Sequence, residues 1–490
     1  MIAMEKLIFC RGNGNPICGD GIMKLCDENI RNRFYGAADF TARKLRCGDF
    51  ELHAYFIDGL VSGNAISEYV IKPLSVSSAT GSVADLYRLV LEGMVYNAVA
   101  VPCTDVEQVC RMLVNGFCVI LFPGVGAVAF EVKTGEKRSI APPELENTAK
   151  GARDAFVETV RTNTSLIRRH LRSPDLRLYE TQVGRRSLTN VSVVWLEGVT
   201  NPELVDRMVE RLGQINIDGF LTTSAVEEYV GGSRLTAFPL LQYTQRADWF
   251  CQGILDGRIG LLVDGIPLGY LLPVDIGYLM NSPEDYGRDA ITASAIRVLR
   301  YVALVLDLVL PALYIAMTVF HFHALPNAVA QVIMQGRETV PFSPVWEILT
   351  LLLAFELLQE SGIHLPQNIG QSVSIIGGIV VGTVGVEAGL ISAIALIAVS
   401  IAGVCGFVLP NRDLAGAIRL WRFLLSVLSA VLGLLGIVVG IGILIIRLAV
   451  IKSMGMRYLL PFESGLARKR LFQYKYRNPR LGTVNRRKQR

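Results

Sequence analysis

The stretch VLRYVALVLDLVLPALYIAMTVF, Val298 to Phe320, decides the fold. A helix rises about 1.5 Å per residue, so this apolar run is long enough to cross roughly 30 Å of hydrocarbon. Before it, charged residues are spread among short strand-like and helix-like runs, and after it apolar runs dominate. The sequence therefore predicts an α+β half, up to residue 296, followed by an α-helical transmembrane domain.

Two further apolar runs follow the first span. The run from Ser372 to Pro410 is too long for one helix and is broken near Glu387, so it predicts two packed segments. The run from Phe423 to Ile446 predicts the last span. Between the first span and these runs lies FELLQESGIHLP, Phe355 to Pro366, whose acids are unusual so close to hydrocarbon.

Charge at the two ends of the chain sets the expected topology. Residues 452–490 carry 12 Lys and Arg against the single acid Glu463, which places this tail on the cytoplasmic side. No signal peptide opens the chain, so the N-terminal half is expected there as well. An even number of spans is then required. We predict about four spans plus a short re-entrant or interfacial helix over residues 344–360, with the basic loop Asn411–Arg422 on the outer side.

The soluble-type half contains a weak internal repeat. The segment that starts at Tyr55 aligns with the one that starts at Val193, and each reads as a strand, an acid-Gly turn and a helix. The segments that start at Asn115 and Asp256 align at a similar offset, and each reads as a β-hairpin. Duplicated units predict two similar α/β subdomains. The expected divisions are an N-terminal extension 1–23, subdomain 1 at 24–150, a helical connector 151–179, subdomain 2 at 180–296, the membrane domain 297–451 and a basic tail 452–490.

Composition and motifs argue against several functions. A hydrophobic content of 51% and a mean hydropathy of +0.41 are too high for an ordinary soluble enzyme. No nucleophile, base and orienter set is visible by spacing, so we expect no enzyme and no cofactor. Cys10, Cys18 and Cys26 lack the paired spacing of a zinc site. Arginines of residues 153–186 are interpreted as a solvated face or a subunit contact. Nucleic acid is not expected, because acids exceed bases in the first 297 residues and no aromatic platform accompanies the arginines.

Four long segments closely resemble the A subunits of GerA-type spore germinant receptors. The similarity covers about residues 24–465 and is clearest in these segments: Gly151–Phe220, Phe238–Asp248, Pro341–Gly382 and Ile451–Phe462. The resemblance implies a multi-pass protein of the spore inner membrane that works with a transporter-like B subunit, which takes the nutrient, and a lipoprotein C subunit. It also implies a homo-oligomer that forms an ion channel.

Two alternative functions stay open. A stage V sporulation AF-like paralogue shares the architecture, although FELLQESGIHLP followed by IGQSVSIIGG favours the receptor subunit. A non-conducting scaffold of the germination complex is the other alternative. Neither the nutrient nor the ion follows from the sequence.

The candidate pore or gating residues are the acids in or beside the apolar runs, because ionisable groups there are functional candidates by default. In an oligomer, one such acid per copy becomes a ring that can replace part of an ion's hydration shell. Glu356 and Glu360, at i and i+4, share one helix face and are the preferred pair. Their alternative role is that of wetted interfacial acids, and for Glu347 it is an acid that complements the helix dipole. The candidates are Asp307, Glu347, Glu356, Glu360 and Glu387.

Two repeated GIVVG motifs are candidates for close helix packing, because glycines four residues apart let helix backbones approach. They contribute Gly378, Gly382, Gly436 and Gly440.

Overall fold

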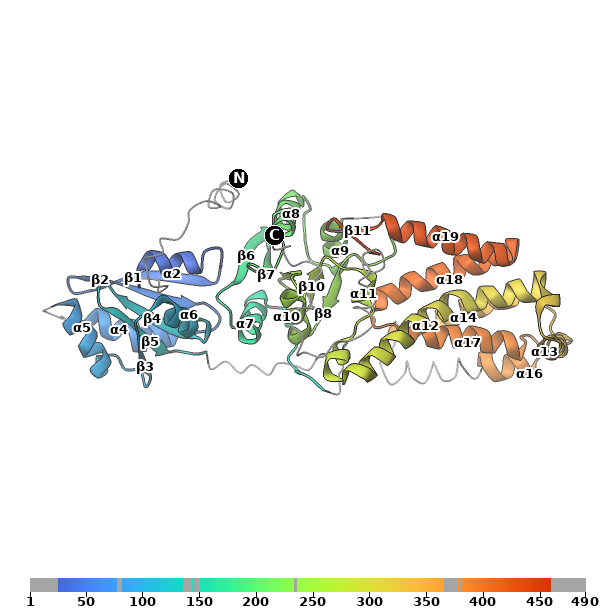
Figure 1. The fold of residues 1–490 in the computed structure, drawn as a ribbon, viewed down its shortest axis with the longest axis horizontal. Coiled ribbons are helices and arrows are strands. Elements are labelled where there is room, and N and C mark those ends of the chain that lie inside the picture. The colour runs from blue at the N-terminus through green and yellow to red at the C-terminus, as the bar shows by residue number, and fades with distance from the viewer. Residues whose placement is uncertain are drawn as a thin grey trace.

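The computed structural model places three bodies in a row along its long axis (Figure 1). Subdomain 1 lies at one end, subdomain 2 in the middle and the apolar helices at the other end. The residues that the structure describes are 25–76, 82–134, 143, 146, 150–232, 236–364, 378 and 380–459. The N-terminal extension and the chain beyond residue 459 lie outside this part.

Subdomain 1 is a five-stranded antiparallel sheet in the order β1-β2-β4-β5-β3, with helices on both faces. One apolar core lies on each face, which explains why β4 and β5 read as almost continuous buried runs. Its strands are β1 Phe40–Cys47, β2 Phe50–Ile57, β3 Ala100–Cys103, β4 Phe117–Phe122 and β5 Gly126–Glu131. Its helices are α2 Asp27–Arg33, α3 Gly63–Ala65, η1 Ile66–Ile71, α4 Lys72–Val76, α5 Val83–Leu89, η2 Val90–Met94 and α6 Val106–Val114.

Subdomain 2 repeats this topology. Its sheet order, β6-β7-β9-β10-β8, is the order of the first sheet with every strand shifted by five, and all its pairs are antiparallel. Its strands are β6 Leu176–Val183, β7 Thr189–Leu196, β8 Gln242–Thr244, β9 Ile259–Val263 and β10 Gly269–Leu272. Its helices are α7 Val160–His170, α8 Pro202–Gln214, α9 Thr223–Gly231, α10 Ala247–Leu255, α11 Ile276–Leu279 and η3 Pro283–Gly287.

The predicted duplication is therefore confirmed, and matching local signals build both copies. The acid-Gly turn places Gly59 and Gly198 at φ +85° and +78°, where a side chain would be strained. Ser62 and Asn201 then cap the helix that follows each turn, because each side chain accepts a hydrogen bond from a first-turn amide.

The expected connector, 151–179, is built into subdomain 2 and also holds subdomain 1. Its helix α7 packs on α10, β7 and β9. From the same helix, Arg168 donates to both oxygens of Asp39 at 2.7 and 2.8 Å, and Ser165 donates to the carbonyl of Gly59 at 2.7 Å. The solvated-face interpretation is wrong for Arg168, because this side chain is only 1% exposed. Its partner Asp39 lies 129 residues earlier in the chain, so the local sequence gives no sign of the pair.

Among the described residues of the helical domain, two helices are long and apolar enough to cross a membrane: α12 with its η4 extension, and α18. Two shorter apolar helices, α17 and α19, accompany them. Its elements are α12 Ala290–Ile315, η4 Ala316–Phe320, η5 Phe322–Ala324, α13 Asn327–Arg337, α14 Pro344–His364, η6 Val380–Val384, α16 Gly385–Glu387, α17 Ala393–Phe407, α18 Arg412–Leu432 and α19 Leu434–Val450.

The structure corrects three expected element boundaries in this domain. The last apolar run forms two helices, because the chain turns at Gly433 with φ +61° and α19 packs back on α18. The expected outer loop 411–422 is instead the first half of α18, which begins after Asn411 accepts a hydrogen bond from the amide of Leu414 at 2.8 Å. The first helix also starts earlier, at Ala290, behind the cap Asp289.

The element expected at residues 344–360 is one continuous helix, α14, which extends to His364 and packs against α12, α17 and α18. At about 1.5 Å per residue its 21 residues measure roughly 31 Å. The number of membrane crossings stays a prediction.

The first residues of the expected tail belong to the fold. Lys452–Ser453 (β11) and Met456–Arg457 (β12) form a hairpin that returns to subdomain 2. The Ser453 hydroxyl donates to the carbonyl of Leu240 at 2.6 Å and accepts from the amide of Val274 at 3.0 Å. Tyr458 is fully buried. The C-terminal end of α19 is thus fastened to subdomain 2.

Candidate functional site: charged pairs between the apolar helices

Asp307 and Arg422 form a buried ion pair between α12 and α18. The Arg422 Nη1 to Asp307 Oδ1 distance is 2.6 Å, and the two side chains are 5% and 0% exposed. Helix α17 closes over the pair, since a Cβ built on Gly406 would lie 3.1 Å from Asp307 Oδ2. That second oxygen has no hydrogen-bond partner among the described residues. Asp307, one of the predicted membrane acids, therefore links α12 to α18 through one carboxylate oxygen, while its other oxygen accepts no hydrogen bond from the described residues.

Arg419, three residues before Arg422 on α18, makes the second pair. Its Nη1 donates to Glu356 Oε1 of α14 at 2.9 Å and also to Gln359. Both side chains of this pair are partly exposed. Because residues at i and i+3 share a helix face, α18 presents both guanidiniums to its neighbours.

Glu347 lies at the opposite end of the bundle, within the first turn of α14. It is buried and accepts a hydrogen bond from the amide of Ser392, the N-cap of α17, at 2.5 Å. Arg337 of α13 lies 3.9 Å away. Glu347 thus accepts a hydrogen bond at the N-terminus of α17 and also lies in the first turn of α14, where an acid complements the helix dipole.

The other two predicted acids are exposed. Glu360 lies one turn beyond Glu356 on α14, and Glu387 ends the short helix α16. The structure therefore brings Asp307 and Glu356 to the two arginines of α18, while Glu347 is held at the far end. Of the five predicted acids, only Glu356 and Glu360 lie together on an accessible face of one helix, α14.

The two GIVVG motifs have different surroundings. A Cβ on Gly436 would overlap the carbonyl of Leu428, and one on Gly440 would overlap the side chain of Leu425, so α18 and α19 touch at both positions. Among the described residues, a Cβ on Gly378 meets nothing within 4 Å, and one on Gly382 reaches only Leu396, at 3.9 Å.

Sequence reasoning missed the basic partners of the acids. The predicted topology places Arg419 and Arg422 in an outer loop and gives no role to Arg337. The i, i+3 spacing of the two α18 arginines beside an apolar run was the available signal, because such charges need acids opposite them. The described part of the chain contains no group of three or more His, Cys, Asp or Glu residues arranged to hold a metal ion.

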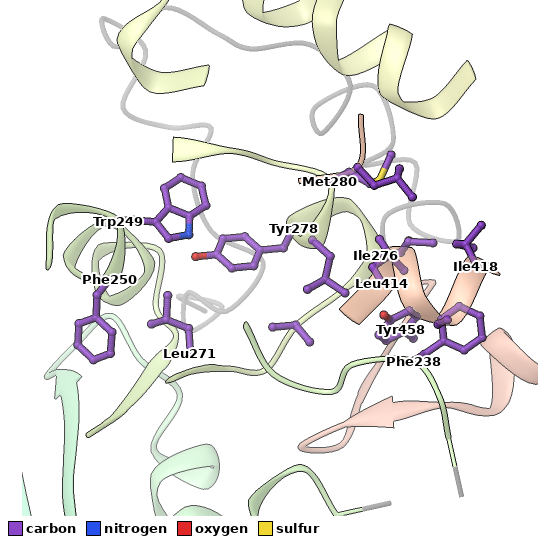
Figure 2. Close-up of a cluster of buried hydrophobic side chains, with 14 of the residues drawn as sticks. Phe238, Trp249, Phe250, Leu271, Ile276, Tyr278, Met280, Leu414, Ile418 and Tyr458 are labelled. Atoms are coloured by element: carbon purple, nitrogen blue, oxygen red, sulfur yellow. The ribbon is translucent and has the colours of Figure 1, made fainter. Parts of the chain in front are cut away.

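The junction between subdomain 2 and the helices is a continuous core. One apolar cluster includes Trp249 and Tyr278 of subdomain 2 together with Leu414 and Ile418 of α18 and Leu448 of α19. Figure 2 shows Trp249 and Tyr278 on one side of this cluster and Leu414 and Ile418 on the other. We call this cluster the junction core.

A buried charge cluster reinforces the junction core. Asp285, just before α12, accepts from Arg297 Nε at 3.1 Å and from Arg300 Nη1 at 2.8 Å. All three side chains are less than 9% exposed. The base of α12 is thereby fixed to the loop that leaves subdomain 2.

The structure is thus a duplicated α/β unit fused to a bundle of apolar helices, two of which are long and apolar enough to cross a membrane among the residues described. The model of the Bacillus/Clostridium GerA spore germination protein matches residues 28–489, and the chain belongs to this family.

Named relatives are similar over most of their length. The chain is 31% identical to spore germination protein KA of Bacillus subtilis over 444 residues, which cover 89% of this chain and 81% of that protein. It is 33% identical to spore germination protein A1 of B. subtilis, with 74% and 75% covered. It is 32% identical to the uncharacterized membrane protein YfkQ of B. subtilis, with 88% and 84% covered.

A solved structure is also similar. The crystal structure of the N-terminal domain of the A subunit of the Bacillus megaterium spore germinant receptor GerK3 matches at 25% identity and a TM-score of 0.41. The match covers 51% of this chain and 95% of that one.

Proposed function

We propose that this chain is the membrane A subunit of a nutrient germinant receptor in the spore inner membrane, where copies assemble into a gated ion channel. Membership of the spore germination family and the two long apolar helices support the receptor assignment. The observation that carries the channel assignment is the pair Glu356 and Glu360, two acids on one accessible face of a helix within an apolar bundle.

The acids are assigned different roles in this proposal. Glu356 and Glu360 face a pore on the symmetry axis, where each copy contributes carboxylates to a ring that attracts cations. Arg419 holds Glu356 while the channel is closed, and its release frees the carboxylate. Asp307 and Glu347 hold helices together, and Glu387 lies at the rim.

The partners follow from the same assignment. A transporter-like B subunit binds the nutrient, a lipoprotein C subunit completes the receptor, and the two subdomains and the tail lie on the cytoplasmic side. The junction core and the hairpin after α19 support a role of subdomain 2 in transmitting a change to the helices. No chemical reaction is assigned to the chain.

The channel is tested by cation release from spores after nutrient addition. Glu356→Gln and Glu360→Gln should slow the release several-fold, because a neutral amide removes the ring charge. Glu92→Gln, an exposed acid of subdomain 1, is the matched control and should behave as wild type. Unchanged release in both pore variants at normal protein levels would refute the pore assignment.

A non-conducting scaffold is the second candidate, favoured by the way Asp307 and Glu347 are used inside the bundle as helix ties. Flux of cations into liposomes that contain the purified chain separates the two. A flux that Glu356→Gln abolishes supports the channel, whereas the absence of any flux supports the scaffold. Co-purification with B and C subunits from spore membranes separates the receptor subunit from a stage V sporulation AF-like paralogue.

A further inference from the structure

Helix α19 has a long apolar face that its neighbours in the chain leave exposed. Large apolar side chains that are 46–70% exposed occur along the whole helix: Leu435, Val438, Val439, Ile443, Ile445, Ile446 and Val450. The helix has 17 residues, so this face is roughly 25 Å long. A continuous exposed apolar surface of this kind marks a contact with another molecule or with a membrane.

Cations follow where this apolar face ends, close to subdomain 2. Arg447 lies in the last turn of α19, Lys452 and Arg457 lie in the hairpin that follows, and all three residues are exposed. The sequence has no Asp or Glu between Asp413 and Glu463. An apolar face that ends in cations matches the two parts of an anionic phospholipid, whose acyl chains are apolar and whose headgroup carries a phosphate.

The hairpin places two of these cations on one side. Its two-residue turn, Met454–Gly455, has φ +47° and +84°, and this tight turn pairs Lys452 directly with Arg457. Directly opposed side chains lie on the same face of a two-stranded ribbon, and the next residue along each strand points to the other face. Ser453 lies on that other face, where it bonds to subdomain 2. Lys452 and Arg457 therefore point away from subdomain 2.

We propose that the end of α19 and the hairpin bind the headgroup of an anionic phospholipid, with an acyl chain along the apolar face of α19. The headgroup phosphate accepts hydrogen bonds from the ammonium of Lys452 and the guanidinium of Arg457, which are the two side chains that proteins use most for phosphate. The stem of Arg447 lies along the apolar face while its charge reaches the headgroup level, as long cationic side chains do at membrane surfaces.

A lipid bound there acts on the joint between α19 and subdomain 2. The hairpin is fixed to subdomain 2 by the hydrogen bonds of Ser453 and by Arg207 of α8, which donates to the carbonyl of Met454 at 2.7 Å. A headgroup held by the same hairpin therefore strengthens this joint in membranes that are rich in anionic lipid. The inference rests on the proposed membrane location, and it does not depend on ion conduction or nutrient binding.

The test is hydrogen–deuterium exchange of the full chain in nanodiscs of phosphatidylcholine, with and without phosphatidylglycerol. The anionic lipid should slow exchange in residues 451–459 at least about fivefold, because each cation near an anionic surface contributes roughly this factor. Lys452→Gln combined with Arg457→Gln should abolish the slowing, whereas Lys452→Arg should keep it. Lys469→Gln combined with Arg470→Gln removes the same charge from the basic tail and is the matched control, which should also keep it.

Several outcomes would overturn the proposal. These are no slowing by phosphatidylglycerol, the same slowing in the Lys452 and Arg457 double variant, or its loss in the tail variant. Equal slowing by inorganic phosphate in neutral nanodiscs would assign the cations to a soluble anion. Slowing that follows the number of chains per nanodisc, rather than the lipid, would assign the apolar face to a second copy. Fast exchange throughout α19 in both lipids would instead contradict the membrane location itself.

Discussion

The two α/β subdomains have one topology and two different surroundings. Subdomain 1 lies at the end of the molecule farthest from the helices and docks on subdomain 2 through α7, where Arg168 holds Asp39 (Figure 1). Subdomain 2 shares the junction core with α12, α18 and α19. The same fold therefore serves once as a peripheral domain and once as the base of a helical bundle.

The difference arises at the ends of the repeat rather than in its sheet. In subdomain 2 the chain continues after β10 into α11, η3 and then α12. Asp285 of η3 accepts hydrogen bonds from Arg297 and Arg300 of α12. The hairpin after α19 returns to the same place. The two sheets are copies of one unit. In the described part of the chain, only the second sheet packs directly on the helices, because α11, η3 and the hairpin after α19 connect it to them.

The largest effect is expected from breaking the base of α12. Asp285→Ala leaves Arg297 and Arg300 buried without a counterion and should lower the stability of the junction by roughly 3–5 kcal/mol. Thermal unfolding of the full chain in nanodiscs measures this. Glu284→Gln removes a neighbouring surface pair with Arg288 and should change little. Equal midpoints for the two variants would contradict the importance of the buried cluster.

A smaller and local effect is expected at the other boundary. Arg168→Met should weaken the docking of subdomain 1 by roughly 2–3 kcal/mol, because Asp39 loses its partner but can regain water when subdomain 1 separates. Limited proteolysis of subdomain 1 should accelerate. The exposed neighbour variant Arg169→Met provides the baseline. Acceleration of the same size in both variants would contradict this role of Arg168.

Within the bundle, Gly436 should tolerate no side chain. Gly436→Ala forces a methyl group against the Leu428 carbonyl and should cost about 1–3 kcal/mol. Gly442→Ala, with open space around its Cβ, should be neutral or slightly stabilising because alanine favours helices. A chemical denaturation series of both variants measures the difference. Equal stability would mean that α18 and α19 do not pack closely there.

The smallest effect concerns pH in subdomain 2. The Asp154 carboxylate, 2.5 Å from His170 Nε2, raises the pKa of that histidine, and the same hydrogen bond lowers the pKa of Asp154. The ion pair stabilises the folded protein fully below the ordinary pKa of histidine. This stabilisation is lost as the pH rises through the raised pKa of His170. It is also lost in acid, when Asp154 becomes protonated. The advantage of wild type over His170→Gln, about 0.5 kcal/mol, should thus be larger at pH 6 than at pH 9.

That pH difference is read from unfolding midpoints at pH 6 and pH 9. A wild-type advantage that is larger at pH 9 than at pH 6 would contradict the pairing.

Much of the fold could be predicted because its signals are local. The acid-Gly turns at Gly59 and Gly198 and the hairpin patterns identify both sheets, and apolar length identifies the first span. The candidate site was harder, because its partners come from distant segments: Asp307 meets Arg422 across 115 residues. Likewise, the break at Gly433 is a single residue in a long apolar run, so hydropathy alone joins α18 to α19.

The central claim is that subdomain 2 and the helices form one cooperative body to which subdomain 1 is attached. Hydrogen–deuterium exchange of the full chain in nanodiscs, wild type against Arg168→Met, tests it most directly. The account predicts faster exchange in β1 to β5, with β9, β10 and the first turns of α18 unchanged. Equally faster exchange in β9, β10 and α18 would contradict it.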